Sequence, residues 1–350
     1  WKAGGSAPSK TYAVTVVSDS GNKYRFDGFG TSAVTLDLQE GGTYKFDQSH
    51  SSNSGHPFRF GTSSNAYDYS TGVTTSGTPG NAGAYTQITV AASAPALYYA
   101  CSSHSGMGGA ANTNSTSGSS NFSGTIQSNL SANVDAGFSI ISYTGAGGSN
   151  AGKTVGHGLS AKPDLIIIKI RPDNYTGKVY NSISGAEKYF DWASTAVLGD
   201  YTQHWNDTEP TSSVFSLGSD ITIGGYPVRD FIAWCFHSID GYSKVGSFSG
   251  NSNVDGTFVY CGFKPALIIQ KGSDHAHGWQ IWDNKRDPHN VATKELFANS
   301  NNAEYTDATY TSIDFLSNGF KLRTSNSSEN SGENIFIAFA ETPFKYSNAR

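Results

Sequence analysis

Short runs of alternating apolar and polar residues, separated by turn formers, occupy the first hundred residues of the chain. An alternation of period two places every second side chain on one face, which is typical of half-buried β-strands. Turn formers such as "EGG" at 40–42 lie between the runs. The pattern therefore predicts a small β-sandwich over residues 1–109. Its predicted strands include "TYAVTVV" (11–17), "KYRFDGF" (23–29), "AVTLDL" (33–38), "TYKFDQS" (43–49), "HPFRFGT" (56–62), "AYTQITV" (84–90) and "APALYYAC" (94–101).

Residues 110–136 have a different composition. Ser, Asn, Thr and Gly dominate this segment, and few of its side chains are apolar. A segment of this kind has little apolar surface to bury, so we predict a linker or an extended surface strap.

After residue 137 the chain repeats itself. Four segments recur in constant order at offsets of 104, 102, 100 and 105 residues. Agreement across four segments indicates two copies of one β unit, over 137–241 and 242–350. The paired segments are "GFSIISYTG" (137) with "GYSKVGSFSG" (241), "KPDLIIIK" (162) with "KPALIIQK" (264), "SSVFSLGS" (212) with "SIDFLSNG" (312), and "FIAWCF" (231) with "FIAFAE" (336).

The runs "LIII" and "LII" inside these copies do not alternate. Uninterrupted apolar runs of this length are typical of strands that are covered on both faces. Each copy is therefore predicted to contain a fully buried strand.

The composition supports a β protein and excludes some function classes. Charged residues make up 15% of the chain, with 40 Gly, 19 Tyr and 20 Phe, a mixture that favours strands and turns over helices. The net charge of −5 argues against a nucleic-acid partner, and no apolar run approaches the roughly 20 residues that membrane insertion requires. Because the chain begins at Trp1 rather than Met, we expect that an upstream segment precedes it.

Catalytic motifs are missing from the sequence. It has no G-x-S-x-G elbow and no H-E-x-x-H pair, so we expect no catalytic residues and no enzymatic activity. Cys101, Cys235 and Cys261 lack the spacing of a disulfide framework, and the last two stand in apolar surroundings typical of buried free thiols.

One segment carries candidate chemistry. "YYACSSHSGMGG" at 98–109 holds Cys101, His104 and the single methionine, Met107. Thiolate, imidazole and thioether are the ligand set of an electron-transfer copper centre. A second imidazole is available from His56, at the head of an alternating strand in "NSGHPFRF".

The sandwich with this Cys-x2-His-x2-Met segment resembles the cupredoxins. In that family a thiolate and two imidazoles hold copper, with a weak axial methionine. The resemblance implies a Greek-key sandwich in which His56, Cys101, His104 and Met107 bind copper. Asn53, with the backbone near it, is expected to orient the histidine.

Two alternatives stay open for this site. His50 is a second candidate imidazole in the same loop, further from the strand. The last strand of the fold is either missing or supplied by the linker, and the fold can also be kept as a rigid module whose site is vestigial or empty.

Aromatic residues offer candidate recognition surfaces. Trp205 in "QHWNDTEP" and Trp279 in "HGWQIW" stand in polar, loop-like contexts. We expect these two side chains to be exposed and to stack on sugars.

The repeated units resemble a module recurrent in structural proteins of marine bacteriophages, assigned to tail fibres and related virion appendages. The resemblance rests on segments such as "HGLSAKPDLIIIK", "FIAWCFHSIDGYSKVGSFSGN", "FVYCGFKPALIIQK" and "WDNKRDP". It implies an all-β protein with a cupredoxin-like sandwich followed by two tandem β-sandwich or jelly-roll-like units.

The function implied is structural attachment of a tailed phage to its host, at the virion surface. The expected partners are copies of the same chain in a homotrimer, other virion proteins and a host glycan or protein. One alternative is a secreted bacterial copper protein with carbohydrate-binding or anchoring domains. Another is a capsid decoration or filament protein.

Overall fold

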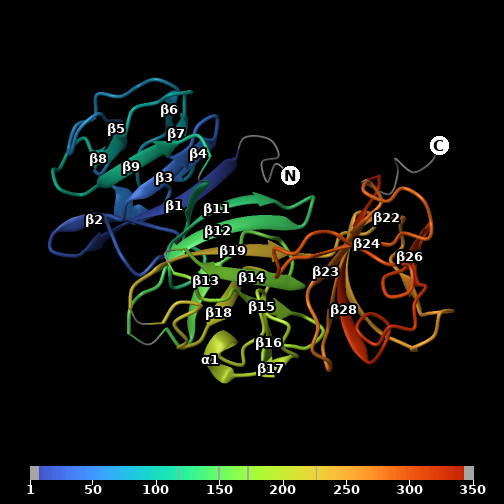
Figure 1. Cartoon of the computed structure of the whole chain (residues 1–350). Helices are drawn as coiled ribbons and strands as arrows, with labels where there is room; N and C mark the ends of the chain where they lie inside the picture. The colour runs from blue at the N-terminus through green and yellow to red at the C-terminus, as the bar shows by residue number, and fades with distance from the viewer. Residues whose placement is uncertain (1–7, 117, 149, 172, 226, 343–350) are drawn as a thin grey trace. The chain divides into compact units, whose positions relative to one another are not determined.

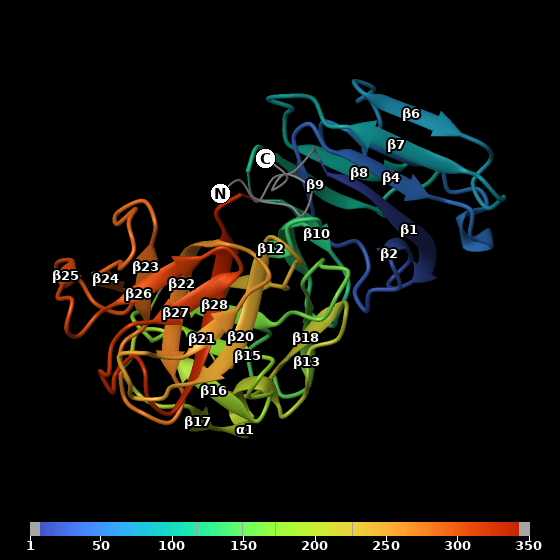
Figure 2. The same cartoon turned by 90° about the vertical axis from the view of Figure 1, so that its right-hand side faces the viewer.

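The computed structural model describes residues 8–116, 118–148, 150–171, 173–225 and 227–342. It divides into two compact units, one comprising 1–133, 139–144 and 153–158, and the other 134–138, 145–152 and 159–350. Strands dominate both units, so the predicted all-β class is confirmed (Figures 1 and 2). The described helical segments are η1 (Ser51–Asn53) and α1 (Thr202–Trp205), and none is long and apolar enough to cross a membrane.

The first unit contains two sheets, with strand orders β2-β1-β4-β7-β6 and β3-β9-β8-β5. β1 pairs with β4 and β3 pairs with β9 in parallel, and the other strand pairs of these two sheets are antiparallel. Each predicted run overlaps a strand of the structure, although "KYRFDGF" and "AVTLDL" match their strands only in part. The strands are β1 (Ser9–Ser18), β2 (Asn22–Phe26), β3 (Leu36–Gln39), β4 (Thr43–Asp47), β5 (Phe58–Gly61), β6 (Val73–Ser76), β7 (Tyr85–Thr89), β8 (Leu97–Cys101) and β9 (Gly109–Asn114).

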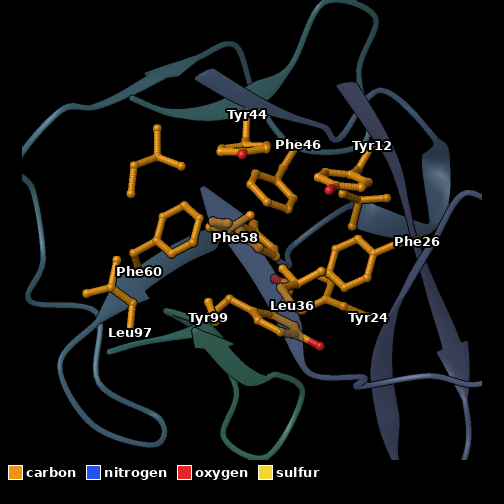
Figure 3. Close-up of a cluster of buried hydrophobic side chains, with 14 of the residues drawn as sticks. Tyr12, Tyr24, Phe26, Leu36, Tyr44, Phe46, Phe58, Phe60, Leu97 and Tyr99 are labelled. Atoms are coloured by element: carbon orange, nitrogen blue, oxygen red, sulfur yellow. The ribbon is translucent and has the colours of Figure 1, made fainter. Parts of the chain in front are cut away.

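Aromatic side chains from both sheets form the core of this unit (Figure 3). Phe46 of the first sheet stacks on Phe58 of the second, with ring centroids 4.6 Å apart, and Phe26 meets Tyr99 edge-on at 5.2 Å. All four rings are buried to 1% exposure or less, and each buried ring contributes roughly 1.5–3 kcal/mol by leaving water. The two sheets therefore form a sandwich around an aromatic core.

Residues 110–136, which were predicted to form a linker or an extended surface strap, contain regular strands. The segment carries most of β9, together with β10 (Ser119–Asn121) and β11 (Ser128–Asn133). The small side chains of β10 are buried because they satisfy polar groups of the sandwich: Ser119 Oγ lies 2.5 Å from Tyr44 Oη, and Ser120 Oγ accepts a 2.8 Å hydrogen bond from Asp37 N. Low apolar content thus does not prevent strand formation where hydroxyl groups are paired.

The strands that follow are numbered through both copies of the repeat. They are β12 (Phe138–Thr144), β13 (Lys153–Gly156), β14 (Leu165–Ile170), β15 (Lys178–Asn181), β16 (Lys188–Asp191), β17 (Gly199–Asp200), β18 (Val214–Leu217), β19 (Asp230–Phe236), β20 (Ser243–Ser249), β21 (Phe258–Tyr260), β22 (Pro265–Gly272), β23 (Gln280–Asp283), β24 (Lys294–Phe297), β25 (Tyr305–Thr306), β26 (Ile313–Leu316), β27 (Gly319–Leu322) and β28 (Glu333–Ala340).

Both copies have the same strand order. The first contains β19-β14-β15-β16-β17 and the second β28-β22-β23-β24-β25, and equivalent pairs are antiparallel in both. The register of β14 on β15 also matches that of β22 on β23: Leu165 pairs with Asn181, and Leu267 pairs with Asp283. Agreement in order and register is the structural counterpart of the sequence repeat.

The two copies share a core. Leu165, Val179 and Phe190 of the first copy pack in one cluster with Trp279, Ile335 and Ile337 of the second. The opposite face of the second copy's sheet covers that copy's own core, where Ile268 packs with Trp282. This arrangement explains the uninterrupted apolar runs, because both faces of β14 and β22 are covered.

Candidate metal centre

His56 lies between the short helix η1 and strand β5, in a segment fixed by its backbone. Its N–H donates to Asn53 O at 2.8 Å, and its carbonyl accepts from Tyr24 Oη at 2.9 Å and from Gln48 Nε2 at 2.8 Å. Three hydrogen bonds to one residue's backbone hold the imidazole at the head of the strand.

Cys101 ends strand β8, directly across from the start of β5. Phe58 is the register partner of Cys101, and Ser102 N donates to Pro57 O at 3.1 Å. His104 follows in the turn between β8 and β9. The antiparallel pairing therefore brings a histidine before one strand next to the cysteine that ends its neighbour.

The donor atoms of His56, Cys101 and His104 lie within 4.8 Å of one another. Cys101 Sγ is 3.9 Å from His56 Nδ1 and 3.8 Å from His104 Nδ1, and the imidazole centroids are 4.6 Å apart. A metal about 2.3 Å from sulfur and about 2.05 Å from each nitrogen, with angles near 120°, separates sulfur and nitrogen by about 3.8 Å. The two observed sulfur–nitrogen distances are compatible with three donors around one ion.

The environment of His56 favours the form of its imidazole that binds a metal. Burial, and secondarily the nearby His104, lowers the pKa of His56. The imidazole is then neutral at pH 7, and its lone pair is available to a metal. Cys101 is 4% exposed, whereas His104 is exposed. An ion can therefore reach the three donors from solvent on the side of the imidazoles.

Met107 lies in the same core cluster as Cys101 and is 1% exposed. Its carbonyl accepts a 3.0 Å hydrogen bond from Tyr24 N, which fixes the end of the loop. Strand β9 begins two residues later, so the last strand of the sandwich is supplied by the segment predicted to be a linker.

Asn53 orders the His56 loop through its backbone carbonyl, which accepts the hydrogen bond from His56 N. The side chain is fully buried, and Nδ2 donates to Val14 O at 2.8 Å and to His50 O at 3.1 Å. His50, the alternative imidazole, is exposed and lies outside the donor group. Its Nδ1 accepts from Ser52 N at 3.2 Å and so caps η1.

Two residues that support the site were missed by sequence reasoning. Gln48 is 1% exposed and bridges the segment, because Oε1 accepts from Phe58 N at 3.1 Å while Nε2 donates to His56 O. Ser103 N donates to Cys101 Sγ at 3.4 Å. The residue Gln48 stands in an alternating strand pattern, and no sequence signal distinguishes its role.

The expectation that Trp205 and Trp279 are exposed recognition residues is wrong. Their exposed fractions are 2% and 1%. Trp205 ends α1 and meets Tyr180 edge-on at 5.8 Å, while Trp279 Nε1 donates to Asp191 O at 3.0 Å. Polar neighbours in the sequence suggested loops, but both indoles fill cores and neither belongs to a recognition surface.

Comparison with known proteins identifies one family. A family model described as a domain of unknown function, DUF7483, matches residues 110–343, which are two thirds of the chain. No curated protein and no solved structure matches the chain. The match covers both copies of the repeat and begins inside β9. The chain therefore belongs to the DUF7483 family.

Proposed function

We propose that the N-terminal sandwich is a cupredoxin-like domain that binds copper. His56, Cys101 and His104 would be the equatorial ligands, with Met107 as the axial one. The observation that supports this proposal is the pair of sulfur–nitrogen distances, 3.8 and 3.9 Å, between donors on adjacent strand ends. The buried thiol and the two imidazoles match the ligand set of copper centres that exchange single electrons.

The chain's own residues would do three things for the ion. Gln48, Tyr24 and the backbone of Asn53 hold the His56 segment, so that the donors need little rearrangement on binding. Ser103 N donates a hydrogen bond to the cysteine sulfur and so helps to fix its position. The aromatic core beneath Cys101 keeps water from the sulfur side.

A copper titration of the full chain tests this proposal. Added Cu(II) is expected to give one equivalent of bound metal and an intense visible thiolate-to-copper absorption. Cys101→Ser should abolish that absorption, whereas Cys235→Ser, at another buried free thiol, should leave it unchanged. An absorption that survives Cys101→Ser, or a chain that takes up no copper, would contradict the proposal.

A second proposal concerns the chain as a whole, as a non-enzymatic attachment component of a tailed-phage virion, assembled as a homotrimer. Among the described residues of the second copy, four aromatic side chains are exposed by 42–59%: Phe258, Tyr260, Tyr305 and Tyr310. Exposed tyrosines offer flat apolar faces with a polar rim, which suit contacts with a host glycan or protein. We propose these four residues for the recognition role that was predicted for Trp205 and Trp279.

Mass spectrometry of purified virions tests the second proposal. The polypeptide should be present at a fixed stoichiometry in the particle, and light scattering of the purified chain should give three times its monomer mass. Absence from the particles would contradict the attachment role even if the copper site is real.

A further inference from the structure

A layer of buried polar side chains lies inside the second copy of the repeat. Gln270, Gln280, Glu295 and Glu329 are each exposed by 2% or less. Burying an ionised carboxylate without a partner costs several kcal/mol, so two such groups in one core need an explanation.

Strand register brings the four residues together. Gln270 of β22 is the partner of Gln280 of β23, and Gln280 is the partner of Phe297 of β24. Residues two apart on a strand share a face, so Glu295 lies on the same face as Gln280. Gln270 Nε2 donates to Glu329 O at 2.6 Å, which places the loop carrying Glu329 against the same face.

Four polar side-chain atoms of this layer lack hydrogen-bond partners. Gln270 Oε1, Glu295 Oε1 and both amide atoms of Gln280 form no hydrogen bond with the described residues. Within the part of the chain that the structure describes, neither carboxylate forms an ion pair with a Lys, Arg or His side chain. Each orphaned buried group costs about 1–3 kcal/mol.

Electrostatics agree with a missing positive charge. Burial raises the pKa of Glu295 to about 7 and, together with the charge of Glu295, that of Glu329 to about 9. The Glu295 charge reaches Glu329, so the two carboxylates are neighbours in the same core.

The first copy has a cation at the corresponding place. Ile168 pairs with Lys178 as Gln270 pairs with Gln280, at the same offset of 102 residues that relates "KPDLIIIK" to "KPALIIQK". Lys178 is 8% exposed, and its ammonium group pairs with Asp191. The ammonium group of Lys178 therefore balances a half-buried carboxylate in the first copy, whereas the second copy has an amide in place of the lysine and Phe297 in place of Asp191.

From this juxtaposition we propose that the second copy binds a calcium ion between the carboxylates of Glu295 and Glu329. The amide oxygens of Gln270 and Gln280 complete the protein's share of the ligands. Carboxylate and amide oxygens are the donors that calcium prefers, and a divalent ion balances two carboxylates.

An open surface cavity lies beside a residue that contacts Glu329. The backbone of Ser312 hydrogen-bonds Glu329, and Ser312 also lines this cavity with Asp255, Val291 and Arg323.

Calcium binding by the full chain, first depleted with a chelator, tests the proposal. Calorimetric titration with CaCl₂ should show one calcium per chain, and calcium should raise the thermal midpoint of the repeat-containing unit. Glu295→Gln should lower the calcium affinity at least ten-fold. The control Glu333→Gln, at an exposed carboxylate of the same copy, should leave the affinity unchanged.

A second variant keeps the test decisive if Glu295→Gln fails to fold. Gln280→Lys reproduces the lysine of the first copy, so it should fold without calcium and bind none. No calcium uptake by the unmodified chain would overturn the proposal, since a shared proton would then neutralise the carboxylates. Unchanged calcium affinity in Gln280→Lys would overturn it as well. Neither result depends on copper at the N-terminal site.

Discussion

At the N-terminal site, hydrogen bonds to the backbone around His56 hold this donor residue in place. Gln48 is the main example, since its amide group joins His56 O to Phe58 N within a fully buried environment. Removing such a support deletes no donor side chain, but it leaves the donors free to move. At the scale of single residues, metal affinity therefore depends on side chains that never touch the metal.

Gln48→Ala is expected to weaken copper binding about 10- to 100-fold and to destabilise the chain by about 1–3 kcal/mol. The reason is that His56 O and Phe58 N each lose a buried partner. Competition with a copper chelator measures the affinity, and denaturant unfolding measures the stability. Gln87→Ala, on the half-buried face of β7, is the control and should change neither quantity. Equal affinity for Gln48→Ala and the parent chain would argue against the supporting role.

A second prediction at the residue scale concerns pH. His204 is 2% exposed, and burial, followed by the charge of Lys178, lowers its pKa to about 4. The unfolded chain binds a proton near pH 6.5 and the folded chain does not, so stability is complete above pH 6.5 and falls as the pH decreases toward 4. The expected loss from this histidine at pH 5 is about 1–2 kcal/mol.

Denaturant unfolding at pH 7 and pH 5 measures this loss. His204→Gln should reduce the difference between the two pH values. An unchanged difference would mean that other groups, such as His277, whose pKa is also lowered to about 4, account for the acid sensitivity.

The sequence identified the donors but not their supports, for a physical reason. Cys101, His104 and Met107 are rare residue types close together, and their chemistry is visible without a structure. Gln48 is a common residue whose role depends on two backbone groups eight and ten positions away. The prediction that Trp205 and Trp279 are exposed was wrong, because polar neighbours in the sequence do not show whether an indole is buried.

At the scale of elements, the turn from β8 to β9 decides whether the site forms. The pattern predicted β8, but the polar composition of residues 110–136 concealed β9, β10 and β11. These strands persist because Ser119 and Ser120 pair with buried hydroxyl and backbone groups. Periodicity detects strands that bury apolar side chains and misses strands that bury hydroxyls.

Gly108→Ala tests the turn. A Cβ atom at position 108 would lie 1.7 Å from Tyr99 O, so β9 could not pair with β8 in its present register. We expect a loss of stability of about 2 kcal/mol or more, in the range of strained or overpacked sites, and weaker copper binding. Gly30→Ala, where a Cβ atom meets nothing within 4 Å, is the control. Thermal unfolding of both variants decides between them, and a Gly108→Ala chain as stable as Gly30→Ala would contradict this account of the turn.

At the scale of the molecule, the two copies of the repeat share a core, so we expect them to unfold together. The sequence predicted two copies and two strands covered on both faces. It did not reveal that each copy covers the other, since apolar runs show that a face is buried and not what buries it. Trp279 of the second copy, 4.8 Å from Trp192 and 5.6 Å from Phe190 of the first, is central to that core.

Trp279→Ala is expected to destabilise both copies together, by about 3–5 kcal/mol. Hydrogen exchange should show faster exchange in β15 and β16 of the first copy as well as in β23 of the second. Tyr260→Ala, at a side chain 59% exposed, is the control and should leave exchange unchanged. Faster exchange confined to the second copy would mean that the copies fold independently.

X-ray absorption of the copper-loaded full chain tests the proposed copper site directly, because it identifies the atoms that bind the metal. We expect one sulfur at about 2.3 Å and two nitrogens at about 2.0 Å from copper, with the sulfur lost in Cys101→Ser. A shell of nitrogen and oxygen alone in the unmodified chain would contradict a site built from His56, Cys101 and His104.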